Sequence, residues 1–104
     1  MEQLRMESTL DREVFAEVLG SKFTLKASGG QSAELELTEV TPLKERSGSK
    51  SYSLIFEVPE SHRVEQGLFE LEHPTLGELQ IFLVPVGMKK ARQELQAVFN
   101  FASD

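Results

Sequence analysis

Residues 68–86 read LFELEHPTLGELQIFLVPV, two apolar runs that are joined by a short turn sequence. In the first run, residues 68–73, apolar residues alternate with two glutamates, which is the pattern of a strand with one buried face. Pro74 then supplies a fixed φ, and Gly77 tolerates a positive φ, the two properties that a tight reversal needs. The stretch therefore predicts an antiparallel hairpin.

The second run of this hairpin, residues 79–86, is apolar at both parities. We therefore expect a central strand whose two faces are both covered by protein. Pro85 has no N–H to donate to a neighbouring strand, so regular pairing is expected to end near it. The two predicted faces are Leu79, Ile81 and Leu83 on one side and Phe82, Val84 and Val86 on the other.

The chain has 104 residues, the size of one domain with one core. We expect a tail over residues 1–7, a helix over 8–19 and a sheet over 22–101. No apolar run approaches the roughly 20 residues that cross a bilayer, and the N-terminus lacks the apolar segment of a signal peptide. A cytoplasmic protein without a membrane partner is therefore expected.

Composition excludes further classes of chemistry. Cysteine is absent, which excludes disulfides and thiolate catalysis. The net charge of −6 repels a phosphate backbone, so nucleic acid is not an expected partner.

Residues 8–19 have the spacing of a short amphipathic helix. Ser8 or Thr9 can cap its first N–H groups, and Gly20 provides a stop after its last turn. A helix of about three turns is too short to be stable alone, so it is expected to pack on the sheet. Its predicted apolar stripe consists of Leu10, Val14, Phe15 and Val18.

Two alternating runs follow the helix and predict the first two strands, over 22–27 and 33–40. Placing their apolar residues on the same side pairs Leu25 with Leu35 and sets Lys26 opposite Glu34. A glycine-containing loop then joins the two strands. The charged residues of this hairpin are interpreted as a solvated outer face.

Further alternating runs predict strands over 51–58, 68–73, 79–86 and 95–101. The polar segments 43–50 and 60–66 are expected to be loops, and the charged segment 88–94 a loop or a hairpin bend. Six successive strands with short connections are typical of a mainly β, antiparallel sheet that curls into a small barrel. We thus predict a six-stranded meander, closed or curled, with one short N-terminal helix packed on it; an open sheet with the helix on one face is the alternative.

The order of motifs in the chain resembles a known family. Five of them follow one another over residues 18–100: VLGSKF, LELTEV, YSLIFEVP, QGLFELEHPTLGELQIFLVPVG and AVFN. This pattern is similar, over nearly the whole chain, to the domain-of-unknown-function family DUF6916. The resemblance implies a small bacterial β-rich domain with no assigned activity and no catalytic residues to transfer. It also implies an accessory role beside phage-tail-like assemblies.

His73 is the most notable titratable residue, because it continues the apolar face of its strand next to the central turn. Together with Glu72 or Glu78, an imidazole at this place can bind a small ligand or transfer a proton. The alternative is structural, since a histidine before a proline commonly donates to a turn carbonyl and holds the hairpin.

The sequence contains no motif for zinc binding, for a serine nucleophile or for phosphate binding. His62 lies in a polar segment 11 positions from His73, without the spacing of a zinc site. The serines stand outside a G-x-S-x-G elbow, and the glycines do not form a phosphate-binding loop. We therefore expect no enzyme, no cofactor and no metal.

An interaction role is the hypothesis that remains. Ile55 and Val98 are predicted to point outward and to form a modest apolar patch for a protein partner or for self-association. The acidic balance suits a basic partner surface. The first hypothesis is a non-enzymatic binding or assembly module of a bacterial complex. The second is a small-ligand-binding or hydrolytic barrel that uses His73 and nearby carboxylates.

Overall fold

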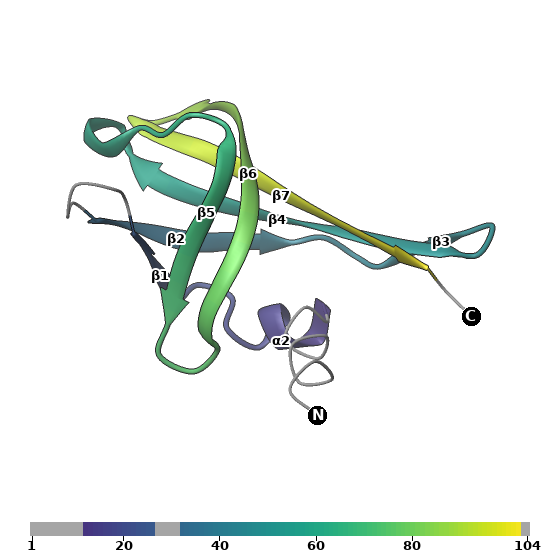
Figure 1. Cartoon of the computed structure of the whole chain (residues 1–104). Helices are drawn as coiled ribbons and strands as arrows, with labels where there is room; N and C mark the ends of the chain where they lie inside the picture. The colour runs from purple at the N-terminus through teal and green to yellow at the C-terminus, as the bar shows by residue number, and fades with distance from the viewer. Residues whose placement is uncertain (1–11, 27–31, 103–104) are drawn as a thin grey trace.

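A computed structural model describes residues 12–26 and 32–102, which form a short helix and seven strands (Figure 1). The elements are α2 Arg12–Ala16, β1 Lys22–Lys26, β2 Ser32–Val40, β3 Lys44–Arg46, β4 Ser49–Pro59, a 3-10 turn η1 Glu60–His62, β5 Gly67–His73, β6 Gly77–Lys89 and β7 Arg92–Ala102.

Six of these strands close into an antiparallel barrel. Their order is β2-β1-β5-β6-β7-β4, and an additional pairing between β2 and β4 closes the sheet on itself. The predicted mainly β fold with one short helix is therefore confirmed, in its closed form. The order differs from a simple meander at one connection, because β4 pairs with β2 and β7 whereas β5 pairs with β1 and β6.

The core lies inside the barrel and follows the predicted alternation. Phe23 and Phe56 meet there edge to face, with ring centroids 5.3 Å apart, a favourable aromatic geometry. The central hairpin is an antiparallel pair from Gly67↔Leu83 to His73↔Gly77, as predicted. The buried apolar side chains are Phe15, Phe23, Leu25, Leu35, Leu37, Tyr52, Leu54, Phe56, Val58, Leu71, Leu79, Ile81, Leu83, Leu95 and Ala97.

The predicted register of the first hairpin is wrong by two residues. Leu35 lies opposite Phe23, and Leu25 lies opposite Ala33. A shift of two keeps every side chain on its face, so the apolar pattern cannot distinguish the two registers. The consequence concerns Lys26, which lies opposite Ser32 and not Glu34.

The helix packs on the open end of the barrel. Phe15 is fully buried, and its ring stacks on Phe99 at 5.8 Å and tilts against Tyr52 at 6.4 Å. The helix ends at Ala16, three residues before the predicted end, and turns over residues 17–20 follow it. Gly20 has a φ of 89° and donates its N–H to the carbonyl of Leu37. The predicted tail over 1–7 and the helix start over 8–11 lie outside the described residues.

Two of the predicted connections are tight hairpins. The prediction of a loop over 43–50 is therefore wrong, whereas the prediction of a loop or hairpin bend over 88–94 is confirmed. Residues 43–50 include β3, which reverses into β4 through Ser47 and Gly48, and β6 reverses into β7 through Lys90 and Ala91. All four residues have a positive φ, the signature of a type I′ turn. The Lys-Ala pair lacks the asparagine or glycine that usually announces such a turn.

Strand β6 is covered on one face only, so the expectation of a strand covered on both faces is wrong. Leu79, Ile81 and Leu83 are buried, whereas Phe82 and Val86 are exposed. A barrel wall has one inner and one outer face, and the helix covers neither Phe82 nor Val86. Regular pairing is interrupted between Pro85 and Gly87, as predicted, but it resumes and continues to Lys89.

Candidate functional site

A row of apolar side chains lies on the outer face of the central hairpin. Leu68 of β5 is paired directly with Phe82 of β6, and their side chains are 62% and 48% exposed. Val84 and Val86 continue the row along β6, the former partly buried and the latter exposed. We name these four residues the outer apolar patch. Scattered exposed apolar residues are ordinary, but adjacent ones on one sheet face are typical of interaction sites.

Carboxylates border the patch on the side of the 74–77 turn. Glu70 lies opposite Gln80 in the outward pair next to Leu68 and Phe82, and Glu72 lies opposite Glu78 in the outward pair after that. Because like charges directly opposite each other are unfavourable, this edge of the hairpin attracts cations.

Lys26 of β1 forms ion pairs with two carboxylates of this acidic border. Its Nζ lies 3.0 Å from a carboxylate oxygen of Glu78 and 3.9 Å from one of Glu72. The hydrogen bond to Glu78, followed by the charge of Glu72, raises the pKa of Lys26 above its usual 10.5. Lys26 therefore stays charged at physiological pH and offsets only part of the negative charge.

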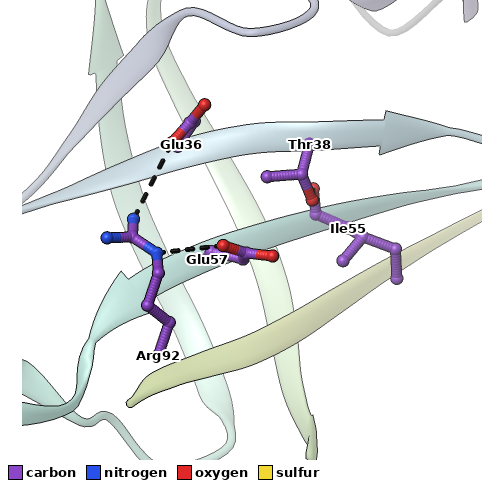
Figure 2. A network of polar contacts seen from close by, with 5 residues as sticks. All are labelled: Glu36, Thr38, Ile55, Glu57 and Arg92. Atoms are coloured by element: carbon purple, nitrogen blue, oxygen red, sulfur yellow. Dashed lines mark hydrogen bonds and ion pairs between the residues drawn. The ribbon is translucent and has the colours of Figure 1, made fainter. Parts of the chain in front are cut away.

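A second polar network lies on the outer face near the β6–β7 turn (Figure 2). Glu36, Glu57 and Glu94 are cross-strand neighbours on β2, β4 and β7. The guanidinium of Arg92 donates from Nε to Glu57 over 2.9 Å and lies 3.8 Å from Glu36. In the same view Thr38 donates its hydroxyl to the carbonyl of Ile55 over 3.2 Å. This network links three strands.

His73 points into the barrel and has partners at both ring nitrogens. Nδ1 accepts the backbone N–H groups of Thr75 and Leu76 at 3.0 and 3.2 Å. The ring proton is therefore on Nε2, which donates to the Ser21 hydroxyl at 2.9 Å. That hydroxyl in turn donates to the carbonyl of Val18. The imidazole thus connects the turn of the central hairpin to the segment that follows the helix.

The environment of His73 favours its neutral form. The residue is only 5% exposed, and its ring lies 4.6 Å from that of Phe23. Burial lowers the pKa of His73 below its usual 6.5, because the charged imidazolium would lose its hydration. Both nitrogens are already used in hydrogen bonds that hold the fold, which matches the structural interpretation, although the ring accepts from the turn and does not donate to it.

The structure does not bring together the three predicted ligand-binding residues. His73 lies on the inner face of β5, whereas Glu72 and Glu78 lie on the outer face and contact Lys26. His62 is exposed in η1, on a different element. Among residues 12–26 and 32–102, no three histidine or acidic side chains are placed to share a metal ion.

The two predicted interface residues both lie on the outer face. Val98 is 53% exposed, and Ile55 is partly buried on the neighbouring strand. Gln96 lies between Ile55 and Val84 of the outer apolar patch, because it pairs with both. These two residues therefore stand beside the patch and are not its centre.

Leu68 and Phe82 were not among the predicted interface residues, although the sequence indicates that they are exposed. When the two strands are paired on either side of the turn, Phe82 of β6 lies on the same face of the hairpin as Glu70 and Glu72 of β5. Such charged neighbours exclude a covering layer of protein. Phe82 had then to be exposed, together with its cross-strand partner Leu68.

The comparisons with known proteins give a family and no activity. A family model described as a domain of unknown function, DUF6916, matches residues 10–99. This match confirms the resemblance seen in the motifs. No curated protein and no solved structure matches the chain. None of the described helices has the length and hydropathy that crossing a membrane requires.

Proposed function

We propose that this chain, which belongs to the DUF6916 family of domains of unknown function, is a non-enzymatic protein-binding module. Its binding surface is the outer apolar patch, Leu68, Phe82, Val84 and Val86. Such a module would act as an accessory component of a larger protein assembly.

The observation that carries this proposal is the direct pair of Leu68 and Phe82 on the outside of the barrel. These two large apolar residues are paired across the hairpin, and Leu68 is 62% and Phe82 48% exposed. Burying apolar surface is favourable by about 25 cal/mol per Å², so a partner that covers this pair gains affinity. Aromatic residues such as Phe82 are also common at the centres of interfaces.

Charge complementarity indicates the chemistry of the partner. Glu70, Glu72 and Glu78 border the patch, and the chain as a whole carries a net charge of −6. A second copy that docked by the same patch would bring these carboxylates close to its own. A different protein with an apolar centre and a lysine- or arginine-rich border fits better. Its attraction should weaken as salt rises.

The ligand-binding or hydrolytic alternative has no observation in its favour among the described residues. A general base needs a free nitrogen near a reacting group, and both nitrogens of His73 are engaged within the fold. We therefore do not propose it.

The proposal can be tested with a photo-crosslinking amino acid at position 68 in cells of the native source. The matched control carries it at position 19, because Leu19 is also exposed, at 53%, and lies outside the patch. We expect one dominant crosslinked protein from position 68 and not from position 19. The proposal would be contradicted if position 68 gave no crosslinked protein, or if both positions gave the same products.

A further inference from the structure

Strands β6 and β7 pair along only part of their lengths. Their ladder ends at Val84↔Gln96, although β6 begins seven residues earlier, at Gly77, and β7 continues for six residues, to Ala102. Beyond this point β6 follows β5, and β7 follows β4 away from the barrel (Figure 1). Within the described chain, residues 97–102 of β7 are therefore paired on one side only, with β4.

The sequence of this free edge is unusual for an edge strand. Residues 97–102 read AVFNFA, without a charge, a proline or a glycine. Edge strands commonly carry a lysine, a proline or a bulge, which prevents other chains from adding to them. The bulge of this region lies on β6, between Pro85 and Gly87, and not on the free part of β7. Among the described residues, an edge of about 20 Å thus has no strand on its second side. The helix contacts this segment from the inner face, where Phe15 packs on Phe99 and Ala97 is buried.

We propose that the free edge of β7, residues 97–102, accepts an extended segment of a partner protein as an additional strand of the sheet. This inference deepens the proposed function, on which it rests, by naming the form in which the partner binds. Backbone hydrogen bonds along the edge supply affinity, and side chains at alternate positions supply specificity.

The outward-facing side chains at the point where β6 and β7 separate indicate which sequence the added partner segment should have. Val98 is 53% exposed on the outer face of β7, and Phe82 is 48% exposed on the outer face of β6. In the register of Val84↔Gln96, they are the first outward-facing residues beyond the last pair. An added strand next to Val98 therefore places its own outward residues beside an apolar surface, so β-branched residues at alternate positions are favoured.

A second copy of the chain is a poorer occupant of the same edge. Two β7 edges that pair about a twofold axis would contribute six residues each, whereas a stable interface uses about 20–30 residues a side. The two copies would also carry −6 each. A flexible segment of another protein needs neither a large interface nor a rigid docking geometry.

The test uses the whole chain, labelled with nitrogen-15, and an eight-residue synthetic peptide, KTVTVTVK. Amide hydrogen exchange is measured for residues 97–102 with and without the peptide. The control is the same peptide with its valine and threonine amides methylated, which keeps the side chains and removes the backbone donors. A second control compares Val98→Lys with Leu19→Lys, two substitutions at equally exposed positions.

We expect the peptide to slow exchange at alternate residues of 97–102 by at least tenfold, and the methylated peptide to leave it unchanged. Val98→Lys should weaken the effect and Leu19→Lys should not. The inference is overturned if the peptide slows nothing in this segment, or if the methylated peptide acts equally. It is also overturned if the protein alone is a dimer by light scattering with residues 97–102 already protected.

Failure of this inference can be separated from failure of the proposed function. Crosslinks from position 68 without protection of 97–102 would retain the outer apolar patch and remove the added strand. Protection of 97–102 by the peptide without crosslinks from position 68 would retain the added strand and remove the patch.

Discussion

Leu68 and Phe82 face each other across β5 and β6, and both side chains point away from the core of the barrel. The inward-facing residues Leu71, Ile81 and Leu83 of the same two strands are almost completely buried. One hairpin thus carries two apolar faces with different physical roles. The inner face stabilises the barrel, and the outer face is free to bind.

This division predicts an asymmetry between adjacent positions of β6. Leu83→Ala should lower the free energy of unfolding by about 2–5 kcal/mol, because it leaves a cavity in the core. Phe82→Ala should lower it by at most about 1 kcal/mol, because it removes only a cross-strand pair at the surface. Urea denaturation of the two variants measures both values. Similar losses for the two would show that Phe82 is part of the core.

The environment of His73 predicts a dependence of stability on pH. The pKa of His73 is below 6.5 in the folded chain, so the unfolded chain binds the proton first. The free energy of unfolding should therefore fall as the pH drops below about 6.5, until the pH has passed the folded pKa. His73→Gln should flatten the curve in this window relative to the native chain. A curve with the same slope in the native chain and in this variant would contradict the role of His73.

Arg92 predicts a stability effect that depends on salt. Arg92→Gln leaves Glu36 and Glu57 without their shared cation, so it should destabilise the fold by about 1 kcal/mol at low ionic strength. The difference from the native chain should shrink in 1 M salt, where charges are screened within about 3 Å. Lys50→Gln, which removes an exposed pair with Glu45, is the control and should have a smaller effect. A loss that salt does not change would indicate a packing role for Arg92.

Both hairpin turns should be more stable with glycine than with alanine at the position of positive φ. Ala91 has a φ of 65°, which costs a residue with a side chain about 1 kcal/mol. Ala91→Gly should therefore stabilise the protein by about 0.5–1 kcal/mol. Gly48 has a φ of 84° with open space around it, so Gly48→Ala should destabilise by a similar amount. Thermal unfolding tests the pair, and a loss of stability in Ala91→Gly would contradict the assignment of the turn.

The sequence specified the six barrel strands because apolar residues recur at every second position along each of them, on its inward face. It left two features open for physical reasons. The register of β1 and β2 was open because a shift by two residues preserves both faces. The β6–β7 turn was open because Lys90 and Ala91 adopt a positive φ without a sequence signature.

The sequence predicted that the barrel has an apolar outer surface, but it did not predict which residues form that surface. The sequence indicated an apolar outer surface and named Ile55 and Val98, which lie beside the patch. Phe82 was assigned to a buried face, because the apolar pattern of β6 alone does not tell an interaction surface from a second core. The hydrogen bond of His73 to Ser21, which is 52 residues away, depends on tertiary structure that no local pattern encodes.

The most direct test of the account is affinity capture from a lysate of the native source with three forms of the chain, followed by quantification of the bound proteins. The forms are the native chain, the double variant Leu68→Ser with Phe82→Ser, and Leu19→Ser as a matched control. We predict that one protein with a basic surface is retained in stoichiometric amount by the native chain and by Leu19→Ser, and is lost from the double variant. Equal capture by all three forms, or capture by none, would contradict a binding role for the outer apolar patch.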